Sequence, residues 1–261
     1  MKKSPLAISA ISLALFMQLG VGRPAAQPDF SSESTDMKST GLIPRYPAGR
    51  RCSPLTSLYM SLIDVDGSKR DEPHTGVDGG RLRDPIFAPA DGVVIAVWEA
   101  DWGSGMEGAL LIRHSKSDLG LQDGVEQYYS EFNHMRYAEI RSIAVGTKVK
   151  RGDWLGRVFW PGGDRRHPPE VHWEVWAIPD EAATTWEEND TGEKYWVNEA
   201  GRLLDPLYML SLNASPGADG IVDIPAFDRR QDYSQFRGFT YILPCPEIKR
   251  RPGSLRNRQP R

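Results

Sequence analysis

The sequence predicts a mainly β protein, an antiparallel β-sandwich or barrel-like sheet with few short helices. Short runs rich in Val, Ile and aromatic residues are separated by Gly, Pro and Asp, which is typical of strands joined by turns. Helical periodicity is scarce, and residues 199–211 are its best short candidate. We therefore expect strands, in chain order, at residues 92–98, 109–113, 127–132, 154–158 and 171–178.

The five expected strands differ in the pattern that supports each. Residues 92–98 are dominated by Val and Ile and end at Trp98, and residues 109–113 are apolar up to Arg113. Residues 127–132 are rich in aromatic side chains, and residues 154–158 are a short segment that starts at Trp154 and ends at Val158. Residues 171–178 are rich in Val and Trp, and because successive side chains of a strand point to opposite faces, Glu170, His172 and Glu174 should share one face.

The first residues predict export. Lys2 and Lys3 precede an apolar run over residues 6–17 and then small residues, as in a secretory signal peptide. We expect the signal peptide over residues 1–26, with cleavage after Gly22 or Ala26, and a protein in the periplasm or outside the cell. An uncleaved anchor helix is the second interpretation, although the run is short for a membrane span. No membrane span is expected after signal removal.

The rest of the chain is expected to form one domain with extensions. Residues 27–45 are rich in Ser, Thr, Asp and Pro and predict a disordered linker, residues 46–212 a single domain, and residues 213–261 a C-terminal extension. The formal charge of −3 and pI near 6.0 give no global basic field, so nucleic acid is not an expected partner. The basic tail over residues 249–261 is either solvated or in contact with anionic envelope polymers.

The two cysteines, Cys52 and Cys245, predict one disulfide in an exported chain. Such a bond would tie the C-terminal residues to the start of the domain. Two unpaired thiols or a redox pair are the alternatives, and the chain has no Cys-x-x-Cys motif to support the latter.

Two of the five histidines belong to a pattern that predicts a zinc site. His74 and Asp78 are four residues apart and share a face if their segment is extended, and His172 lies on a later expected strand. Two imidazoles and one carboxylate are typical of a catalytic zinc shell, which keeps one coordination position open for chemistry.

Four segments, in this order, resemble the lysostaphin-type, or LytM-like, zinc metallopeptidases, which cut peptides of bacterial cell walls. Residues 74–78 (HTGVD) are similar to the family's His-x-x-x-Asp motif, and residues 84–94 to its following strand pair. Residues 132–135 (FNHM) are similar to its Tyr-x-His-Leu strand end, and residues 146–156 to its glycine-rich turn. The resemblance covers about residues 73–178, with a weaker extension over residues 205–208, and implies the lysostaphin-type peptidase fold for the domain at 46–212.

The resemblance also implies the roles of individual residues. His74, Asp78 and His172 would bind Zn²⁺, and His134 would lie beside the open position to handle a proton or the oxyanion. The family's third motif, His-x-His, appears here as residues 170–172 (EVH), with Glu170 in place of the first histidine. Glu170 is then a general base, a fourth metal ligand, or a carboxylate that pairs with Arg165 or Arg166 and takes no part in catalysis.

The function expected from the sequence is an exported zinc metallopeptidase that hydrolyses peptide bonds in peptidoglycan stems or cross-links. The alternative is a catalytically degenerate domain that binds peptidoglycan or activates another hydrolase. Of the other histidines, His114 is expected to be a turn residue, and His167 precedes the ligand strand and is a weaker candidate for the missing imidazole.

Overall fold

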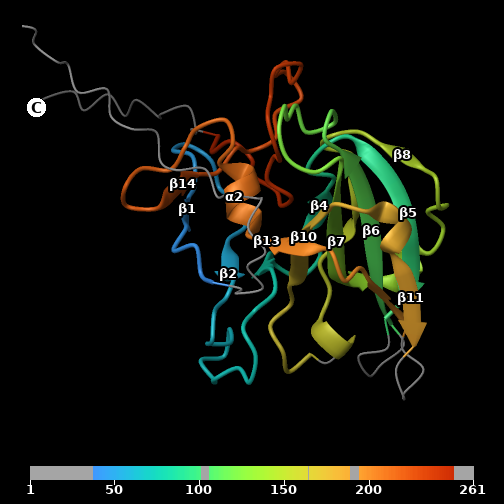
Figure 1. Ribbon diagram of the computed structural model, residues 1–261. Helices are drawn as coiled ribbons and strands as arrows, with labels where there is room; N and C mark the ends of the chain where they lie inside the picture. Colours follow the sequence, from blue (N-terminus) through green and yellow to red (C-terminus); the bar gives the residue numbers. More distant parts are fainter. Residues whose placement is uncertain (1–37, 101–105, 164, 189–193, 250–261) are drawn as a thin grey trace, which may run out of the picture. The chain divides into compact units, whose positions relative to one another are not determined.

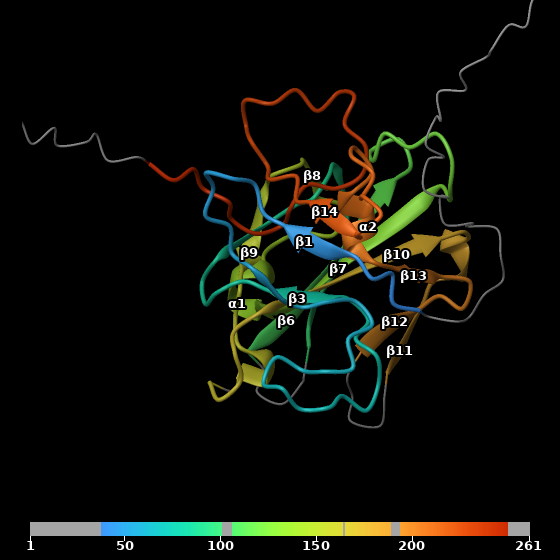
Figure 2. The same ribbon diagram turned by 90° about the vertical axis from the view of Figure 1, so that its left-hand side faces the viewer.

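The structure, a computed structural model, describes residues 38–100, 106–163, 165–188 and 194–249 (Figures 1 and 2). The expected signal peptide and residues 250–261 of the basic tail lie outside the described residues. The mainly β prediction is confirmed, because strands and loops account for nearly all of the described chain. None of the helices in the described ranges has the length and hydrophobicity of a membrane-spanning segment.

The centre of the fold is an eight-stranded sheet in which every neighbouring pair is antiparallel. All the expected strands except 154–158 belong to this sheet. Its order is β2 (Leu55–Ser57), β3 (Val77–Gly79), β10 (Val171–Ile178), β7 (Gln127–Arg136), β6 (Glu107–Ser115), β5 (Gly92–Glu99) and β8 (Lys148–Val149), and β13 (Arg202–Leu204) also pairs with β10.

Three two-stranded sheets complete the fold. They are β4 (Pro85–Phe87) with β9 (Trp154–Arg157), β11 (Thr185–Glu188) with β12 (Lys194–Val197), and β1 (Ile43–Arg45) with β14 (Ile221–Asp223). Only the last of these named pairs is parallel. Strand β1 lies inside the segment that the sequence predicted to be a linker, because its backbone pairs with residues more than 170 positions away, which local composition does not reveal.

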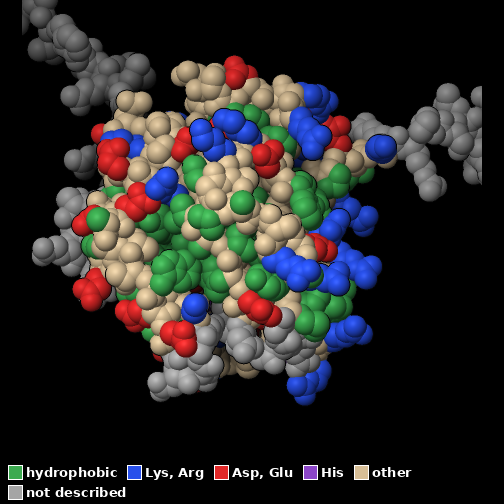
Figure 3. Space-filling model, turned by 90° about the vertical axis from the view of Figure 1, so that its right-hand side faces the viewer, with side chains coloured by type: hydrophobic (Ala, Val, Ile, Leu, Met, Phe, Trp, Pro, Cys, Tyr) green, Lys and Arg blue, Asp and Glu red, His purple; other side chains and the backbone are tan. Residues whose placement is uncertain are grey.

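Hydrophobic side chains occupy both faces of the central sheet. The main core combines side chains from its long strands, such as Leu110, Phe132 and Trp173, with Ile86 of β4 and Leu155 of β9. A smaller cluster combines other side chains of the same long strands with Trp196 of the β11–β12 hairpin. Its buried members are Ala96, Leu111, Tyr129, Ile178 and Trp196. Figure 3 views the side of the molecule that carries β5, β8 and β11, where hydrophobic side chains gather among charged ones.

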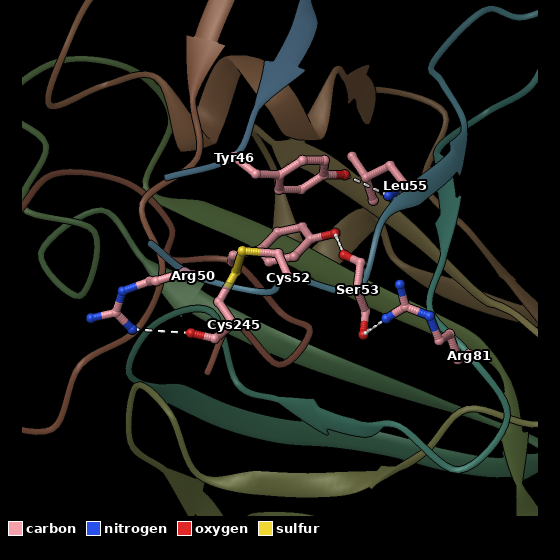
Figure 4. Close-up of a disulfide and its surroundings, with 8 residues drawn as sticks. Tyr46, Arg50, Cys52, Ser53, Leu55, Arg81 and Cys245 are labelled. Carbon is pink, nitrogen blue, oxygen red and sulfur yellow. Dashed lines mark hydrogen bonds between the residues drawn. A yellow bond between two sulfur atoms is a disulfide. The ribbon is translucent and has the colours of Figure 1, made fainter. Parts of the chain in front are cut away.

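The residues after 212 contribute to the main core although the sequence analysis set them apart as an extension. Phe239, Tyr241 and Ile242 are almost fully buried in it. The expected disulfide is confirmed, since Cys52 is bonded to Cys245 (Figure 4). Tyr241 also donates a hydrogen bond to the carbonyl oxygen of Ser53 at 2.7 Å, so the C-terminal segment is fixed to the chain just before the metal motif.

The helix expected over residues 199–211 is shorter than predicted. Helix α2 covers only Pro206–Leu210, with Asp205 as its N-cap, and residues 202–204 instead form β13. Pro206 at the first helical position explains the late start, because proline is favoured there and disfavours helical geometry in the residue before it. The other helices are α1 (Tyr137–Ile140) and the 3₁₀ turns η1 (Pro161–Gly163) and η2 (Glu181–Ala183).

Candidate metal centre

The central sheet brings the three expected metal ligands together. Asp78 lies on β3 directly opposite His172 on β10, so their side chains are cross-strand neighbours. His74 lies in the turn that leads into β3. Gly76 lets this turn approach β10, because a Cβ atom there would lie 2.3 Å from the carbonyl oxygen of Trp173.

Each of the three side chains directs one possible metal-ligand atom at the other two. His74 Nε2 lies 3.0 Å from Asp78 Oδ1 and 3.0 Å from His172 Nδ1, and His172 Nδ1 lies 2.8 Å from Asp78 Oδ1. His74 and Asp78 are buried, and His172 is only slightly exposed. These distances define the cluster His74, Asp78 and His172, the group of possible metal ligands found among the described residues.

Hydrogen bonds on the outer side of each ring fix which nitrogen carries the proton. His74 Nδ1 lies 3.0 Å from the carbonyl oxygen of Leu58, which only accepts, so Nδ1 is the donor and Nε2 is left with a lone pair. His172 Nε2 lies 3.0 Å from Glu174 Oε1. Glu174 also accepts hydrogen bonds from Thr75 Oγ1 and Trp176 Nε1, and such a carboxylate makes Nε2 of His172 the donor.

The consequence is that two ring lone pairs and one carboxylate oxygen converge, which is stable only with a cation or an extra proton among them. The pKa values of His172 and Asp78 reflect this need for a positive charge. Although burial disfavours the imidazolium, hydrogen bonds to Asp78 and Glu174 raise the pKa of His172 to about 10. Although burial disfavours the carboxylate, hydrogen bonds from His172 and His74 hold the pKa of Asp78 well below its usual range. The donor set therefore fits a divalent metal with nitrogen and oxygen ligands.

Arg70 fixes the second oxygen of the Asp78 carboxylate. Its Nη2 donates to Asp78 Oδ2 at 3.1 Å and to Asp64 Oδ1 at 3.0 Å. Because Oδ2 is held from behind, Oδ1 is the oxygen directed at the two histidines. Arg70 was not identified from the sequence, and no motif in this segment marks it.

Comparison with known proteins finds one protein family that this chain resembles. Residues 72–185 match the model of peptidase family M23. This segment, less than half of the chain, is therefore similar to peptidase family M23. The match confirms the family resemblance that the sequence motifs predicted.

Three solved structures that are similar to this chain come from peptidases or M23 proteins. They are a zinc-containing peptidase from Vibrio cholerae (25% identity, TM-score 0.34, covering 48% of this chain and 33% of that one), the catalytic domain of the antimicrobial peptidase lysostaphin from Staphylococcus simulans (18%, 0.34, 61% and 90%) and a prophage-encoded M23 protein from Enterococcus faecalis, as an A109H mutant (22%, 0.31, 51% and 84%). This chain thus spans a third of the Vibrio cholerae peptidase. No curated protein matches the chain.

His134 lies near His172, one of the three clustered side chains. The His134 ring lies at the end of β7 with its centroid 6.3 Å from that of His172, and Nδ1 of His134 lies 2.8 Å from Glu107 Oε1. Glu107 was not identified from the sequence, since it lies 27 residues before its partner.

Glu170 directly precedes β10, two residues before His172, and it is not one of the three converging ligands. It is buried, and Oε2 has no hydrogen-bond partner among the residues that the structure describes. Burial and then the charge of Asp78 raise the pKa of Glu170 to about 8. Arg165, one of its two expected ion-pair partners, instead places its guanidinium over Trp160 at 5.3 Å.

The other two histidines, His114 and His167, do not belong to the metal cluster. His114 is fully buried at the end of β6, where Nδ1 lies 2.6 Å from the carbonyl oxygen of Asp91 and Nε2 lies 3.1 Å from Ser130 Oγ. The expectation of a turn residue is wrong for His114, because β6 extends to Ser115. His167 is exposed in the loop before β10.

Proposed function

We propose that this protein is an exported zinc metallopeptidase that hydrolyses peptide bonds in the stems or cross-links of peptidoglycan. The observation that carries the proposal is the convergence of His74 Nε2, Asp78 Oδ1 and His172 Nδ1 within 3.0 Å of one another in a segment similar to peptidase family M23. Two imidazoles and one carboxylate are a donor set that zinc uses in hydrolases. Bound there, zinc supplies Lewis-acid activation of a water molecule and of the scissile carbonyl.

The protein's own side chains then have separate tasks. His74, Asp78 and His172 hold the metal, while Leu58 and Glu174 keep the two rings in the orientation that binding needs. Glu170 takes the proton of the attacking water, because its carboxylate is buried, stands two residues before His172 and is not one of the converging ligands.

His134 completes the proposed site. Its ring lies on the same side as His172, where it stabilises the oxyanion of the tetrahedral intermediate or passes a proton to the leaving amine. Export is supported by the Cys52–Cys245 disulfide and by the pattern of basic and then apolar residues at the N-terminus.

A second candidate function is favoured by one observation. Glu170 stands where the lysostaphin-type pattern has an imidazole, and this replacement favours a domain that binds peptidoglycan or activates another hydrolase rather than one that hydrolyses peptides. Three proteins separate the two functions: the wild type, Glu170→Ala and Glu170→His, each first checked for zinc.

The peptidase proposal predicts that wild-type protein digests purified cell walls. Glu170→Ala should keep its zinc and lose on the order of 10²–10⁴ in rate, the usual contribution of a positioned proton acceptor. If the wild type binds walls but releases nothing, and Glu170→His creates hydrolysis, the binding module is the correct function. Activity unaffected by Glu170→Ala would return Glu170 to a structural role.

A further inference from the structure

Glu107 is a buried carboxylate with one assigned hydrogen-bond partner. It opens β6 and is 1% exposed. Its Oε1 atom lies 2.8 Å from Nδ1 of His134, and its Oε2 atom has no hydrogen-bond partner among the described residues. Burying a carboxylate is unfavourable unless it is paired, and among the described residues the partner of the Glu107 carboxylate is His134.

The backbone is bent so that these two side chains meet. Gly108 pairs with Met135 and Leu110 with Phe132, which leaves Ala109 opposite both Asn133 and His134. This is a β-bulge, a device that redirects a side chain from the regular alternation of the strand. His134 has a φ of 57°, in the left-handed region that non-glycine residues rarely adopt.

The strained backbone is held on both sides of His134. Its carbonyl oxygen accepts a hydrogen bond from the Phe159 amide at 3.1 Å, and Met135 bridges to Val158. An unfavourable backbone conformation beside a candidate metal centre is retained where the surrounding structure fixes it and where it serves the site. Here its result is the contact between His134 and Glu107.

We propose that Glu107 is a positioning residue for His134: its carboxylate keeps the proton on Nδ1 and makes Nε2 the nitrogen that accepts and returns a proton during peptide hydrolysis. A carboxylate behind a catalytic imidazole sets its tautomer and its orientation in other hydrolases. The role rests on the proposed peptidase function. Glu107 itself contacts neither the clustered ligands nor a reacting atom in any interaction assigned to it.

The test uses Glu107→Gln, which keeps the size of the side chain and removes its charge, and Glu107→Ala, which removes the acceptor. Glu126→Gln is the matched control, because it is the same change at an exposed carboxylate, which pairs with Lys116 and directly precedes β7. Zinc content and melting temperature are measured for each protein. Steady-state digestion of a soluble cross-linked wall peptide gives kcat and KM.

We expect zinc content to stay at the wild-type level in all variants. Glu107→Gln and Glu107→Ala should lose on the order of 10²–10⁴ in kcat, with KM changed by less than about threefold, because the imidazole acts in the transition state. Glu126→Gln should match the wild type. A kcat within about threefold of wild type in both Glu107 variants would overturn the proposal.

A second measurement does not depend on hydrolysis. Nitrogen-15 NMR of the histidine rings reports which ring nitrogen carries the proton. We expect Nδ1–H at His134 in the wild type and a shift to Nε2–H, the form that free histidine prefers, in Glu107→Ala. The same tautomer in both proteins overturns the proposal. If the wild type digests no wall peptide at all, the peptidase function fails, and the tautomers still decide whether Glu107 sets the state of His134.

Discussion

The Nε2 atom of His74 lies 3.0 Å from the Nδ1 atom of His172, and the outer nitrogen of each ring faces an acceptor, the Leu58 carbonyl oxygen or the Glu174 carboxylate. Two lone pairs that face each other beside the Asp78 carboxylate form an arrangement that favours a cation. The proposed zinc site therefore follows from the outer hydrogen bonds as much as from the three ligands themselves.

The first prediction concerns these ligands. His74→Ala, Asp78→Ala and His172→Ala should each lower zinc from about one ion per chain to a trace, because two remaining donors do not complete a zinc shell. Elemental analysis of protein purified without added chelator measures this. His167→Ala is the matched control, since His167 is exposed in a neighbouring loop and should leave the zinc content unchanged. Wild-type protein without stoichiometric metal would refute the site.

The second prediction concerns the arginine behind Asp78. Arg70→Gln should weaken zinc affinity by about 10–100-fold, because it removes the donor that fixes Asp78 Oδ2 and directs Oδ1 at the histidines. Competition with a zinc-binding dye gives the Kd. Arg45→Gln serves as the control, since Arg45 pairs with Asp223 on the exposed β1–β14 sheet. Equal zinc affinity for Arg70→Gln and wild type would show that Arg70 has no part in the centre.

The third prediction concerns the disulfide. Replacing Cys52 and Cys245 together by serine should lower the free energy of unfolding by roughly 2–5 kcal/mol, since the bond closes a loop of 193 residues in the unfolded chain. Denaturant unfolding of the variant and of wild type, with and without reductant, measures the loss. Reduced wild type should behave like the variant. Equal stability of oxidised and reduced wild type would contradict the role assigned to the bond.

The fourth prediction concerns acid stability. Burial lowers the pKa of His114 to about 4, against about 6.5 in the unfolded chain. Between pH 6.5 and pH 4, His114 is protonated in the unfolded state but not in the folded state. The free energy of unfolding therefore falls as the pH drops towards 4, by at most roughly 3 kcal/mol from this group. The full contribution is present above pH 6.5.

His114→Gln keeps a donor for Asp91 and an acceptor for Ser130 but does not titrate. Its stability should therefore depend less on pH between 7 and 4 than that of wild type. Denaturant unfolding across this range compares the two, with His167→Gln at an exposed position as the control. Parallel stability curves for wild type and His114→Gln would refute the contribution of His114.

The sequence predicted the longer strands and missed the shorter ones for a physical reason. Strands β5, β6, β7 and β10 are eight to ten residues long, enough for runs of β-branched and aromatic side chains to stand out. Strands such as β1 and β14 have three residues each, and they exist because distant backbone segments pair. The burial of Phe239 and Tyr241 likewise depends on long-range packing, which no local pattern records.

The site divides in the same way. The motif spacing indicated His74, Asp78 and His172, and the strand alternation already placed Glu174 on the face of His172, although no role for it followed. Arg70 contacts Asp78 from a loop and Glu107 contacts His134 beside a β-bulge, so the sequence held no signal for either.

The most direct test of the account is digestion of purified peptidoglycan by wild-type protein loaded with one zinc per chain, followed by mass analysis of the released peptides. The account predicts fragments that differ from their parent peptides by one water, loss of this activity with a chelator, its recovery with added zinc, and none from His74→Ala. Zinc-loaded, folded wild type that releases no peptide under any of these conditions would contradict the claim that this M23-like domain is a peptidase.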